Sequence, residues 1–458
     1  MAFMMINPKY LKSKFPYAEC VHNFTTFFNL YDKIFRLGFK LSRIARSAWR
    51  IGRLADIVAR LPLPNLFMQN DVLFIGYLEG ALGLGESLRG LVRSVAAAGL
   101  SFALYPLRSG IETRLIGGFM EHRYDLKHRH RINVIEIAAT HLSEMFKETG
   151  RWKTAHSYNI LRTYWELSEA PMAWASMLTD IHEIWVPNKF VGNAFRKIFP
   201  GKIVVVPPCI EIESGDISSR DYFDMDPGLF YFLFSFDYFS YPARKNPLAV
   251  VRAFQAAFPN PGDRVGLVIK SMSAINQHPA IKSAILESAR LDPRIKVIDS
   301  MLTRDKMLSL FRLSDCYVSL HRSEGFGLAM AEAMAFGKPV IGTDYSGSTD
   351  FLLDDTGFRV SYDLRPVEPD EYIFSDGQSW AEPVEAAASE AMRRVFYDKQ
   401  ERQTRAAAGK AFVEAHYGRN QVGRIATERL RDILGKSPSR NPGFYTGSIT
   451  ALRTPSTS

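Results

Sequence analysis

Residues 316–350 read CYVSLHRSEGFGLAMAEAMAFGKPVIGTDYSGSTD, and this is the most informative stretch of the sequence. An apolar run predicts a strand that ends near His321, a bend containing Gly325 and Gly327 follows, and a helix is expected to begin near Leu328. In a parallel sheet this order places the bend at the carboxyl edge, where ligands bind. The alternative is that the glycine turn only connects the strand to the helix and binds no ligand.

The bend carries residues suited to a nucleotide sugar. Free amides of a first helical turn can bind a diphosphate, and glycines let it approach the backbone closely. Glu324 precedes the helix and Glu332 lies on it, so two carboxylates eight residues apart can bind hydroxyl groups at the two ends of one ligand. A pyrophosphate between them fits this arrangement.

Outward from this stretch, short apolar runs alternate with helical periods in two successive sets. The C-terminal set predicts strands at 231–236, 265–269, 295–298, 317–320 and 340–342, with helices at 247–258, 279–291, 304–313 and 328–336. The N-terminal set predicts strands at 72–76, 102–107, 134–137, 160–165, 184–187 and 203–207, with a helix at 84–98. Two α/β units joined by a polar linker near 211–228 indicate two Rossmann-like domains facing a cleft.

The string from Glu324 to Glu332, with Gly-Phe-Gly inside it and Gly-Lys-Pro-Val after it, resembles the Glu-x7-Glu signature of retaining GT-B glycosyltransferases of family 4, the group 1 glycosyltransferases. The resemblance extends from about residue 72 to 435. Similar segments are Gly76-Tyr77 with Gly83-Leu84-Gly85-Glu86, Tyr158-Asn159-Ile160, Tyr164-Trp165-Glu166, residues 183–188, and Trp380-Ala381-Glu382-Pro383.

The resemblance implies a role for each matching position. Glu324 is expected to bind hydroxyls of the donor sugar and Glu332 the ribose. The backbone of Gly325, Phe326, Gly327 and Leu328 is expected to bind phosphate or sugar, with Gly83 and Gly85 near the donor phosphate across the cleft. The reaction is expected to retain the anomeric configuration and to transfer a hexosyl-type group without a metal ion or other cofactor.

A pair of cations is expected to neutralise the departing nucleoside diphosphate. Arg244 and Lys245 are the candidates, and Lys245 is preferred for the phosphate contact. Members of the family commonly have an Arg just after the preceding strand, where this sequence has Phe236-Asp237. Arg244 is therefore expected either to replace that Arg or to face solvent.

On the acceptor side, Glu166 follows an expected strand, so it belongs either to the active cleft or to the cap of the next helix. His141 and His156 are weaker candidates, since no partner is evident for either. Asp224-Met-Asp226 has the spacing of a metal-binding Asp-x-Asp, but it lies in the polar linker and is interpreted as a solvated turn.

Charge is unevenly distributed along the chain. Residues 1–65 contain eleven Lys or Arg against three acidic residues, which leaves only +1 of the total net charge of +9 for the rest. The apolar spacing and the Lys and Arg residues of 28–60 predict a basic amphipathic helix. This helix is expected to lie on an anionic membrane, to pack on the protein body or to bind a partner. No nucleic-acid-binding motif is present.

We expect a basic helical extension at 1–65, an acceptor domain at 66–215, a donor domain at 216–417, a helix at 418–435 returning to the first domain, and a disordered tail at 436–458. Sparse cysteines and the lack of an apolar run of membrane-spanning length favour a cytoplasmic protein, peripheral on the inner face of a membrane if the basic helix binds lipid.

The expected reaction is sugar transfer from a nucleotide-sugar donor to an acceptor hydroxyl on a glycan or lipid-linked acceptor, in glycan or polysaccharide biosynthesis. Two alternatives share the fold: a nucleotide-sugar epimerase, and a non-catalytic subunit that binds nucleotide sugars. A glycan phosphorylase would need a cofactor-binding lysine motif, and none is evident.

Overall fold

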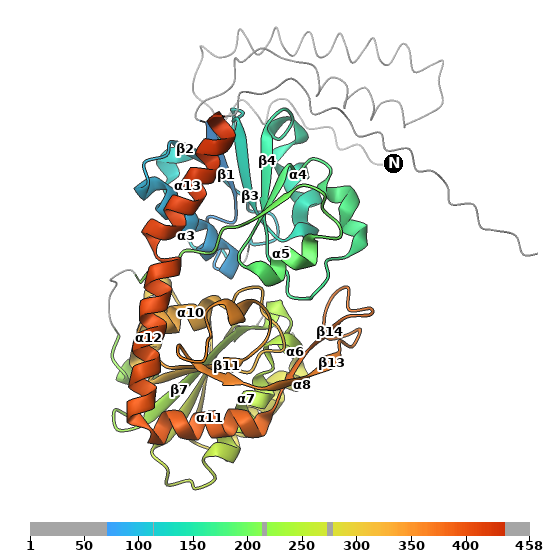
Figure 1. Ribbon diagram of the computed structural model, residues 1–458. Helices are drawn as coiled ribbons and strands as arrows, with labels where there is room; N and C mark the ends of the chain where they lie inside the picture. The colour runs from blue at the N-terminus through green and yellow to red at the C-terminus, as the bar shows by residue number, and fades with distance from the viewer. Residues whose placement is uncertain (1–70, 113, 213–217, 273–277, 436–458) are drawn as a thin grey trace, which may run out of the picture. The chain divides into compact units, whose positions relative to one another are not determined.

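The computed structural model describes residues 71–435 apart from 113, 213–217 and 273–277. These residues form two six-stranded sheets and a two-stranded hairpin (Figure 1). The expected extension at 1–65, its helix at 28–60 and the expected tail at 436–458 lie outside the described residues.

The first sheet is parallel throughout and has the strand order β2-β1-β3-β4-β5-β6. Its strands β1 and β3 are buried along their whole length, because helices cover both faces of the sheet. The strands are β1 (Val72–Gly76), β2 (Phe102–Pro106), β3 (Ile132–Glu136), β4 (Tyr158–Arg162), β5 (Glu183–Val186) and β6 (Lys202–Val205).

Three helices connect these strands: α3 (Gly83–Ala97), α4 (Leu142–Thr149) and α5 (Lys189–Phe195). Helix α3 follows β1 and buries Leu88, Leu91 and Val92 against the sheet. Helix α5 begins after Asn188, whose side chain caps it by accepting a hydrogen bond from the Val191 amide at 3.0 Å.

The second sheet is also parallel, with the order β12-β11-β10-β7-β8-β9. Aromatic and aliphatic side chains of its central strand β7 fill the core on both sides. The strands are β7 (Phe230–Asp237), β8 (Val265–Met272), β9 (Ile295–Asp299), β10 (Cys316–Ser319), β11 (Val340–Thr343) and β12 (Phe358–Val360).

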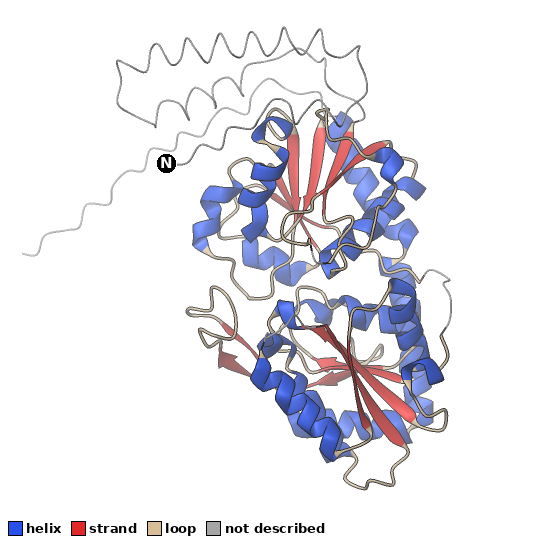
Figure 2. Ribbon diagram, turned by 180° about the vertical axis from the view of Figure 1, so that it is seen from behind, coloured by secondary structure: helices blue, strands red, loops and turns tan. Residues whose placement is uncertain are grey.

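Helices cover both faces of the second sheet (Figure 2). They are α6 (Pro242–Lys245), α7 (Pro247–Ala257), α8 (Pro279–Leu291), α9 (Arg304–Leu313), α10 (Leu328–Ala335) and α11 (Glu385–Tyr397), with a 3-10 turn η8 (Ser346–Asp350) after β11. The structure thus confirms the fold class predicted from the sequence, two Rossmann-like α/β units.

Beyond β12 the chain forms an antiparallel hairpin of β13 (Tyr362–Pro366) and β14 (Ser379–Pro383), in which Leu364 pairs with Ala381. The sequence analysis did not anticipate this hairpin, although the Trp380-Ala381-Glu382-Pro383 motif lies within β14. Strand β13 is partly or fully exposed along its whole length, so it has no buried apolar run that would distinguish it from a loop in the sequence.

The last two helices are α12 (Lys399–Tyr417) and α13 (Arg419–Gly435). Helix α13 lies beside α3 (Figure 1), and its Val422, Ala426 and Leu430 enter the core of the first α/β unit. Among the described residues, none of the helices is long and apolar enough to span a membrane.

A glycine sets the distance between α13 and α3. A Cβ atom built on Gly423 would lie 2.4 Å from the carbonyl oxygen of Ser94 on α3, too close for a non-bonded contact. We expect Gly423→Ala to push the helices apart and to lower the free energy of unfolding by about 1–3 kcal/mol, measured by urea denaturation. Gly435→Ala is the control, because no atom lies within 4 Å of the Cβ added at the end of the same helix. Equal stability of the two variants would contradict this account.

Candidate active site

The bend predicted from the sequence lies at the carboxyl edge of the second sheet. Strand β10 ends at Ser319, two residues before the expected end, and α10 begins at Leu328 as expected. Gly327 has φ +95°, a backbone conformation that favours glycine, and it turns the chain into the helix. The first-turn amides of α10 therefore follow directly on Glu324 and the glycine bend.

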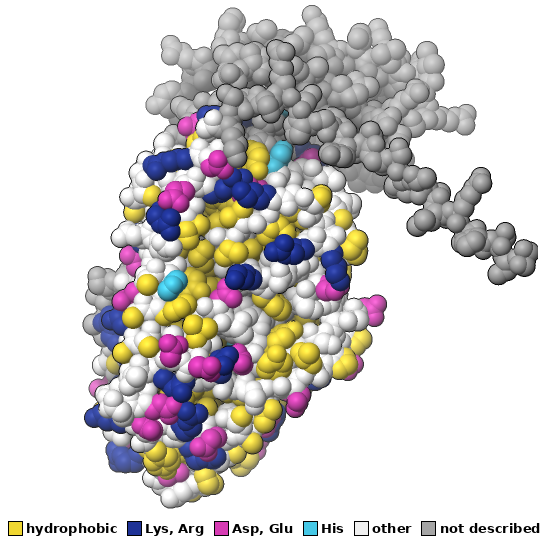
Figure 3. Space-filling view, in the orientation of Figure 1, with side chains coloured by type: hydrophobic (Ala, Val, Ile, Leu, Met, Phe, Trp, Pro, Cys, Tyr) yellow, Lys and Arg dark blue, Asp and Glu magenta, His cyan; other side chains and the backbone are white. Residues whose placement is uncertain are grey.

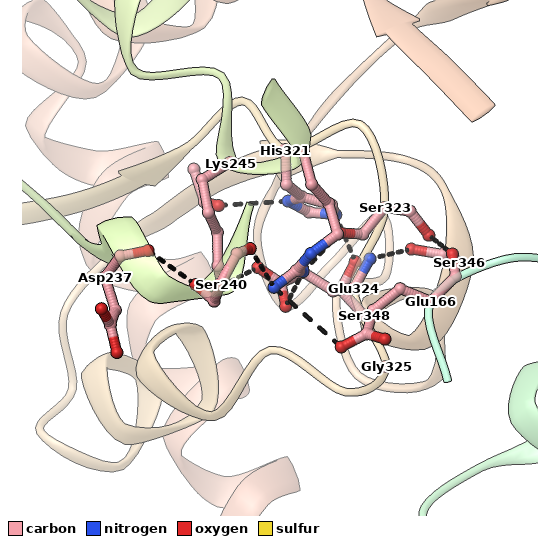
Figure 4. Close-up of polar contacts among 12 residues, drawn as sticks. Glu166, Asp237, Ser240, Lys245, His321, Ser323, Glu324, Gly325, Ser346 and Ser348 are labelled. Atoms are coloured by element: carbon pink, nitrogen blue, oxygen red, sulfur yellow. Dashed lines mark hydrogen bonds and ion pairs between the residues drawn. The ribbon is translucent and has the colours of Figure 1, made fainter. Parts of the chain in front are cut away.

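Glu324 is the centre of a buried ion cluster (Figure 4). Its side chain accepts a hydrogen bond from Arg244 at 2.9 Å through Oε2 and one from Lys245 through Oε1. Glu324 is only 7% exposed and Arg244 4%. Burial alone would raise the pKa of Glu324, but Lys245 and Arg244 outweigh it and hold that pKa well below its ordinary value. The carboxylate is therefore ionised throughout the neutral range.

Arg244 does not face solvent, so that alternative from the sequence is wrong. Its guanidinium also donates to the carbonyl oxygens of Ser323 at 2.8 Å and Ser240 at 3.3 Å. Burial opposes its charge, but Glu324 and Glu166 raise the pKa of Arg244 above its ordinary value. Arg244 and Lys245 thus bring two cations to one carboxylate.

Asp237, at the position where an Arg was expected, ends β7. Its Oδ1 accepts a hydrogen bond from the Phe239 amide at 2.8 Å, and its Oδ2 lies 3.8 Å from Arg114 of the first α/β unit. Burial raises the pKa of Asp237. This position therefore supplies no cation, and the positive charge near Glu324 comes from α6.

The backbone around Glu324 is fixed by the η8 turn. The Glu324 amide donates to Ser346 Oγ at 2.8 Å, and the Gly347 amide donates to the Glu324 carbonyl at 2.9 Å. Ser346 has φ +68°, a strained conformation for a residue with a side chain. Asn188 of the first unit completes the contact by donating to the carbonyls of Gly325 at 2.7 Å and Gly347 at 3.2 Å.

The starts of two helices face each other beside this bend. A Cβ atom on Gly83, at the start of α3, would lie 3.6 Å from Leu328 Cδ1, at the start of α10. Gly85 is needed for packing, since a Cβ there would lie 2.6 Å from the carbonyls of Tyr77 and Gly80. Phe326 points away from the site and packs against Phe351. The N-termini of α3 and α10 are therefore closest where Gly83 lies against Leu328.

Glu332 lies at the other end of the site, on α10. It accepts a hydrogen bond from Arg304 at 2.6 Å, and Arg304 also lies 3.8 Å from Glu86 of α3. A small pocket is lined by residues that include Glu86, Arg304 and Glu332. Glu324 and Glu332 therefore each have a cationic partner. Glu324 precedes α10 and Glu332 lies on it.

Glu166, expected either in the active cleft or in a helix cap, lies beside the ion cluster. Its Oε1 lies 4.0 Å from Arg244, and its Oε2 accepts a hydrogen bond from Tyr372 at 2.6 Å. The side chain is 22% exposed, so it is more accessible than that of Glu324. Its carbonyl also accepts a hydrogen bond from Ser323.

The remaining sequence candidates lie outside this cluster. His141 Nδ1 lies 3.0 Å from the Tyr77 hydroxyl, and His156 adopts φ +63° in an exposed turn. Asp224 forms an ion pair with Lys296 at 2.5 Å, and Asp226 accepts a hydrogen bond from the Gly228 amide at 2.7 Å. Within the described part of the chain, no group of three or more His, Cys, Asp or Glu side chains is arranged to hold a metal ion.

Sequence reasoning missed several residues that shape the site: Asn188, Arg304, His321, Ser346 and Tyr372. His321 was noted only as the end of a strand, yet it is fully buried and bridges Ser319 and Ser348, with 3.1 Å to each hydroxyl. Asn188 stood in a quoted motif, and its N-cap position could have marked it as a fixed side chain. Nothing in the local sequence indicated Tyr372.

Part of the chain that forms this site also matches a known protein family in sequence. Residues 244–361 match the family model described as Glycosyl transferases group 1. The match begins at Arg244 and includes Lys245, Glu324, Glu332 and η8. A comparison with curated protein sequences found no match.

Solved structures resemble nearly the whole described chain. Sucrose-phosphate synthase from Thermosynechococcus elongatus is 14% identical, with a TM-score of 0.60, and the match covers 81% of this chain and 100% of that one. HepE from Anabaena, in complex with UDP and glucose, is 12% identical, with a TM-score of 0.55 and coverage of 80% and 100%. A glycosyltransferase from Rickettsia africae is 15% identical, with a TM-score of 0.52 and coverage of 81% and 100%.

The fold is GT-B. Within this GT-B fold, Glu324 of the ion cluster lies four residues before the first residue of α10, Leu328. Leu328 also lines the pocket that includes Glu332. The family match includes the candidates Arg244, Lys245, Glu324 and Glu332. Gly83, Gly85 and Glu166 precede the matched residues, and for them the comparisons add the likeness of fold alone.

We expect the buried His321 of the second α/β unit to make a pH-dependent contribution to stability. Burial, together with Lys245 and Arg244 and against Glu324, lowers the pKa of His321 from 6.5 to about 4. The unfolded chain therefore takes up a proton first as pH falls, so the stabilisation is present above pH 6.5 and is lost toward pH 4. We expect wild type to lose about 2 kcal/mol more unfolding free energy than His321→Gln between pH 7 and pH 5. Equal losses, measured by urea denaturation at both pH values, would show that His321 does not titrate this way.

Proposed function

We propose that this chain is a glycosyltransferase that transfers a sugar from a nucleotide-sugar donor to an acceptor hydroxyl with retention of configuration. The observation that carries the proposal is the ion cluster of Glu324, Arg244 and Lys245 beside the starts of α10 and α3. Two side-chain cations and two helix N-termini together favour an anionic group at this point. The HepE structure with UDP and glucose supports a nucleotide-sugar ligand.

The reaction needs positioning and charge stabilisation. The bond between the anomeric carbon and the diphosphate breaks, and its electron pair leaves with the nucleoside diphosphate. Arg244, Lys245 and the first amides of α10 stabilise the charge that develops there. The acceptor oxygen bonds to the anomeric carbon on the same face, and its proton passes to the departing phosphate or to Glu166.

The two signature carboxylates hold the donor at its ends. Glu324 binds sugar hydroxyls, since its ionised oxygens can only accept hydrogen bonds. Glu332 binds the ribose, with Arg304 beside it. Glu166, which is partly exposed, faces the acceptor hydroxyl.

Removing the charges of the ion cluster tests the proposal. We expect Lys245→Met to lower the rate of nucleoside diphosphate release by about 10²–10³-fold, because the cation stabilises charge mainly in the transition state. We expect Glu324→Gln to abolish the rise in melting temperature that a nucleotide sugar causes. The measurements are a thermal-shift screen with UDP-, GDP- and ADP-sugars, followed by diphosphate release with a glycan or lipid-linked acceptor.

Lys296→Met is the matched control, because Lys296 pairs with Asp224 on an exposed turn. Conversion of the donor without an acceptor would favour an epimerase. Tight donor binding without turnover would favour a non-catalytic subunit. If no nucleotide sugar stabilises the wild-type protein, the proposal fails.

We further propose that the acceptor belongs to glycan or polysaccharide biosynthesis at a membrane, with residues 28–60 on anionic lipid at its inner face. The sequence of 1–65 holds most of the net positive charge. In Figure 3, basic and acidic side chains are interspersed over the visible face of the described part. The described part therefore offers no comparable positive region on that face.

We expect the full chain to sediment with vesicles containing phosphatidylserine at low salt and to be released at high salt. Replacing Arg43, Arg50 and Arg53 by Glu should abolish sedimentation. The control replaces Arg290, Arg393 and Arg424, which form exposed pairs on described helices. Unchanged sedimentation of the first variant would exclude this role.

A further inference from the structure

The loop of the β13–β14 hairpin reaches from the second α/β unit to a side chain of the first. Tyr372 lies in this loop, is 6% exposed, and donates its hydroxyl proton to Glu166 Oε2 at 2.6 Å. Burial, with Glu166 adding to it, raises the pKa of Tyr372 well above its ordinary value. The hydroxyl therefore keeps its proton and remains a hydrogen-bond donor throughout the neutral range.

This hydrogen bond fixes which way Glu166 faces. With Oε2 bound to Tyr372, Oε1 is turned toward Arg244 at 4.0 Å, and the same guanidinium binds Glu324 at 2.9 Å. In Figure 4, Glu166 lies beside Glu324 and Gly325. Among the hydrogen bonds of the described residues, none joins Tyr372 to Arg244, Lys245 or Glu324, so Glu166 is the group that connects Tyr372 with the ion cluster.

The ring of Tyr372 is held by aromatic neighbours from both units. Its centroid lies 5.6 Å from that of Trp165, 4.6 Å from that of Tyr241 and 6.1 Å from that of Trp380. At the end of the loop, Gln378 donates to the Glu169 carbonyl at 3.3 Å. The loop is therefore attached to the segment 165–169 at more than one point.

The base of the hairpin is attached to the ion cluster through Glu382 of the Trp-Ala-Glu-Pro motif. Glu382 accepts hydrogen bonds from Arg322 at 2.7 Å, Arg365 at 2.7 Å and Asn246 at 3.3 Å. Arg322 precedes Glu324 by two residues, and Asn246 follows Lys245. The hairpin therefore connects the two segments that supply the ion cluster with the segment that supplies Glu166.

We infer that Tyr372 is a positioning residue for the transfer reaction, which orients Glu166 against Arg244 and the acceptor, and that the hairpin anchored by Glu382 holds it there. The inference rests on the proposed function. The Trp-Ala-Glu-Pro motif then has a physical role, since its Glu382 binds both Arg322 and Arg365. Glu371, next to Tyr372 in the loop, also binds Arg365.

The test is a double-mutant cycle of Tyr372→Phe and Glu166→Gln in the full-length protein, with kcat and KM for the donor measured for each variant. We expect Tyr372→Phe to lower kcat about tenfold or more, with less than a twofold change in the donor KM. In the Glu166→Gln background, the same change should alter kcat by less than twofold, because Glu166 is then no longer the group to be oriented.

Tyr362→Phe is the matched control, since Tyr362 lies on β13 and its ring packs against Tyr345. Wild-type kcat in Tyr372→Phe would overturn the inference, as would an equal loss of kcat with and without Glu166. The thermal shift with the donor separates the two levels. If the wild-type protein binds the donor and turns over, and Tyr372→Phe does the same at an unchanged rate, the inference alone is refuted. If the wild-type protein shows neither a thermal shift nor turnover, the proposed function is refuted.

Discussion

The buried charge of Glu324 is the constraint on which the rest of the site depends. A carboxylate removed from water costs several kcal/mol unless opposite charges and hydrogen bonds compensate it. Arg244 and Lys245 supply that charge from α6, and η8 binds the Glu324 backbone through Ser346 and Gly347. The order of β7, α6, β10 and α10 around the sheet edge is therefore what brings the charges together.

Three groups of the first α/β unit lie beside the glycine bend, the start of α10 and the ion cluster. Asn188 binds the carbonyls of the glycine bend, Gly83 places the start of α3 against Leu328, and Glu166 approaches Arg244. Glycine is needed where these segments meet, since a Cβ on Gly347 would lie 2.6 Å from Asn188 Nδ2 of the first unit and 2.4 Å from the Gly325 carbonyl. Close backbone packing and charge compensation thus act at the same few positions.

Much of this arrangement could be predicted from the sequence. Helices α8 and α9 have the predicted bounds, because a regular apolar period with a proline or a capping threonine at its start is a local signal. The burial of Arg244 was not predictable, because its partner Glu324 is 80 residues away. Tyr372 was missed for the same reason: its hydrogen bond spans 206 residues. The Trp380-Ala381-Glu382-Pro383 motif drew attention to β14, but no local signal marked the loop that carries Tyr372. The predicted extension at 1–65 lies outside the described residues.

A crystal structure of this protein with a bound nucleotide sugar would show directly whether the donor binds at the glycine bend. We expect the diphosphate to lie against the amides at the start of α10, within hydrogen-bond distance of Lys245, with the sugar at Glu324 and the ribose at Glu332. A nucleotide sugar bound elsewhere, with Glu324 still paired to both cations and no ligand atom at the bend from Gly325 to Leu328, would contradict this expectation.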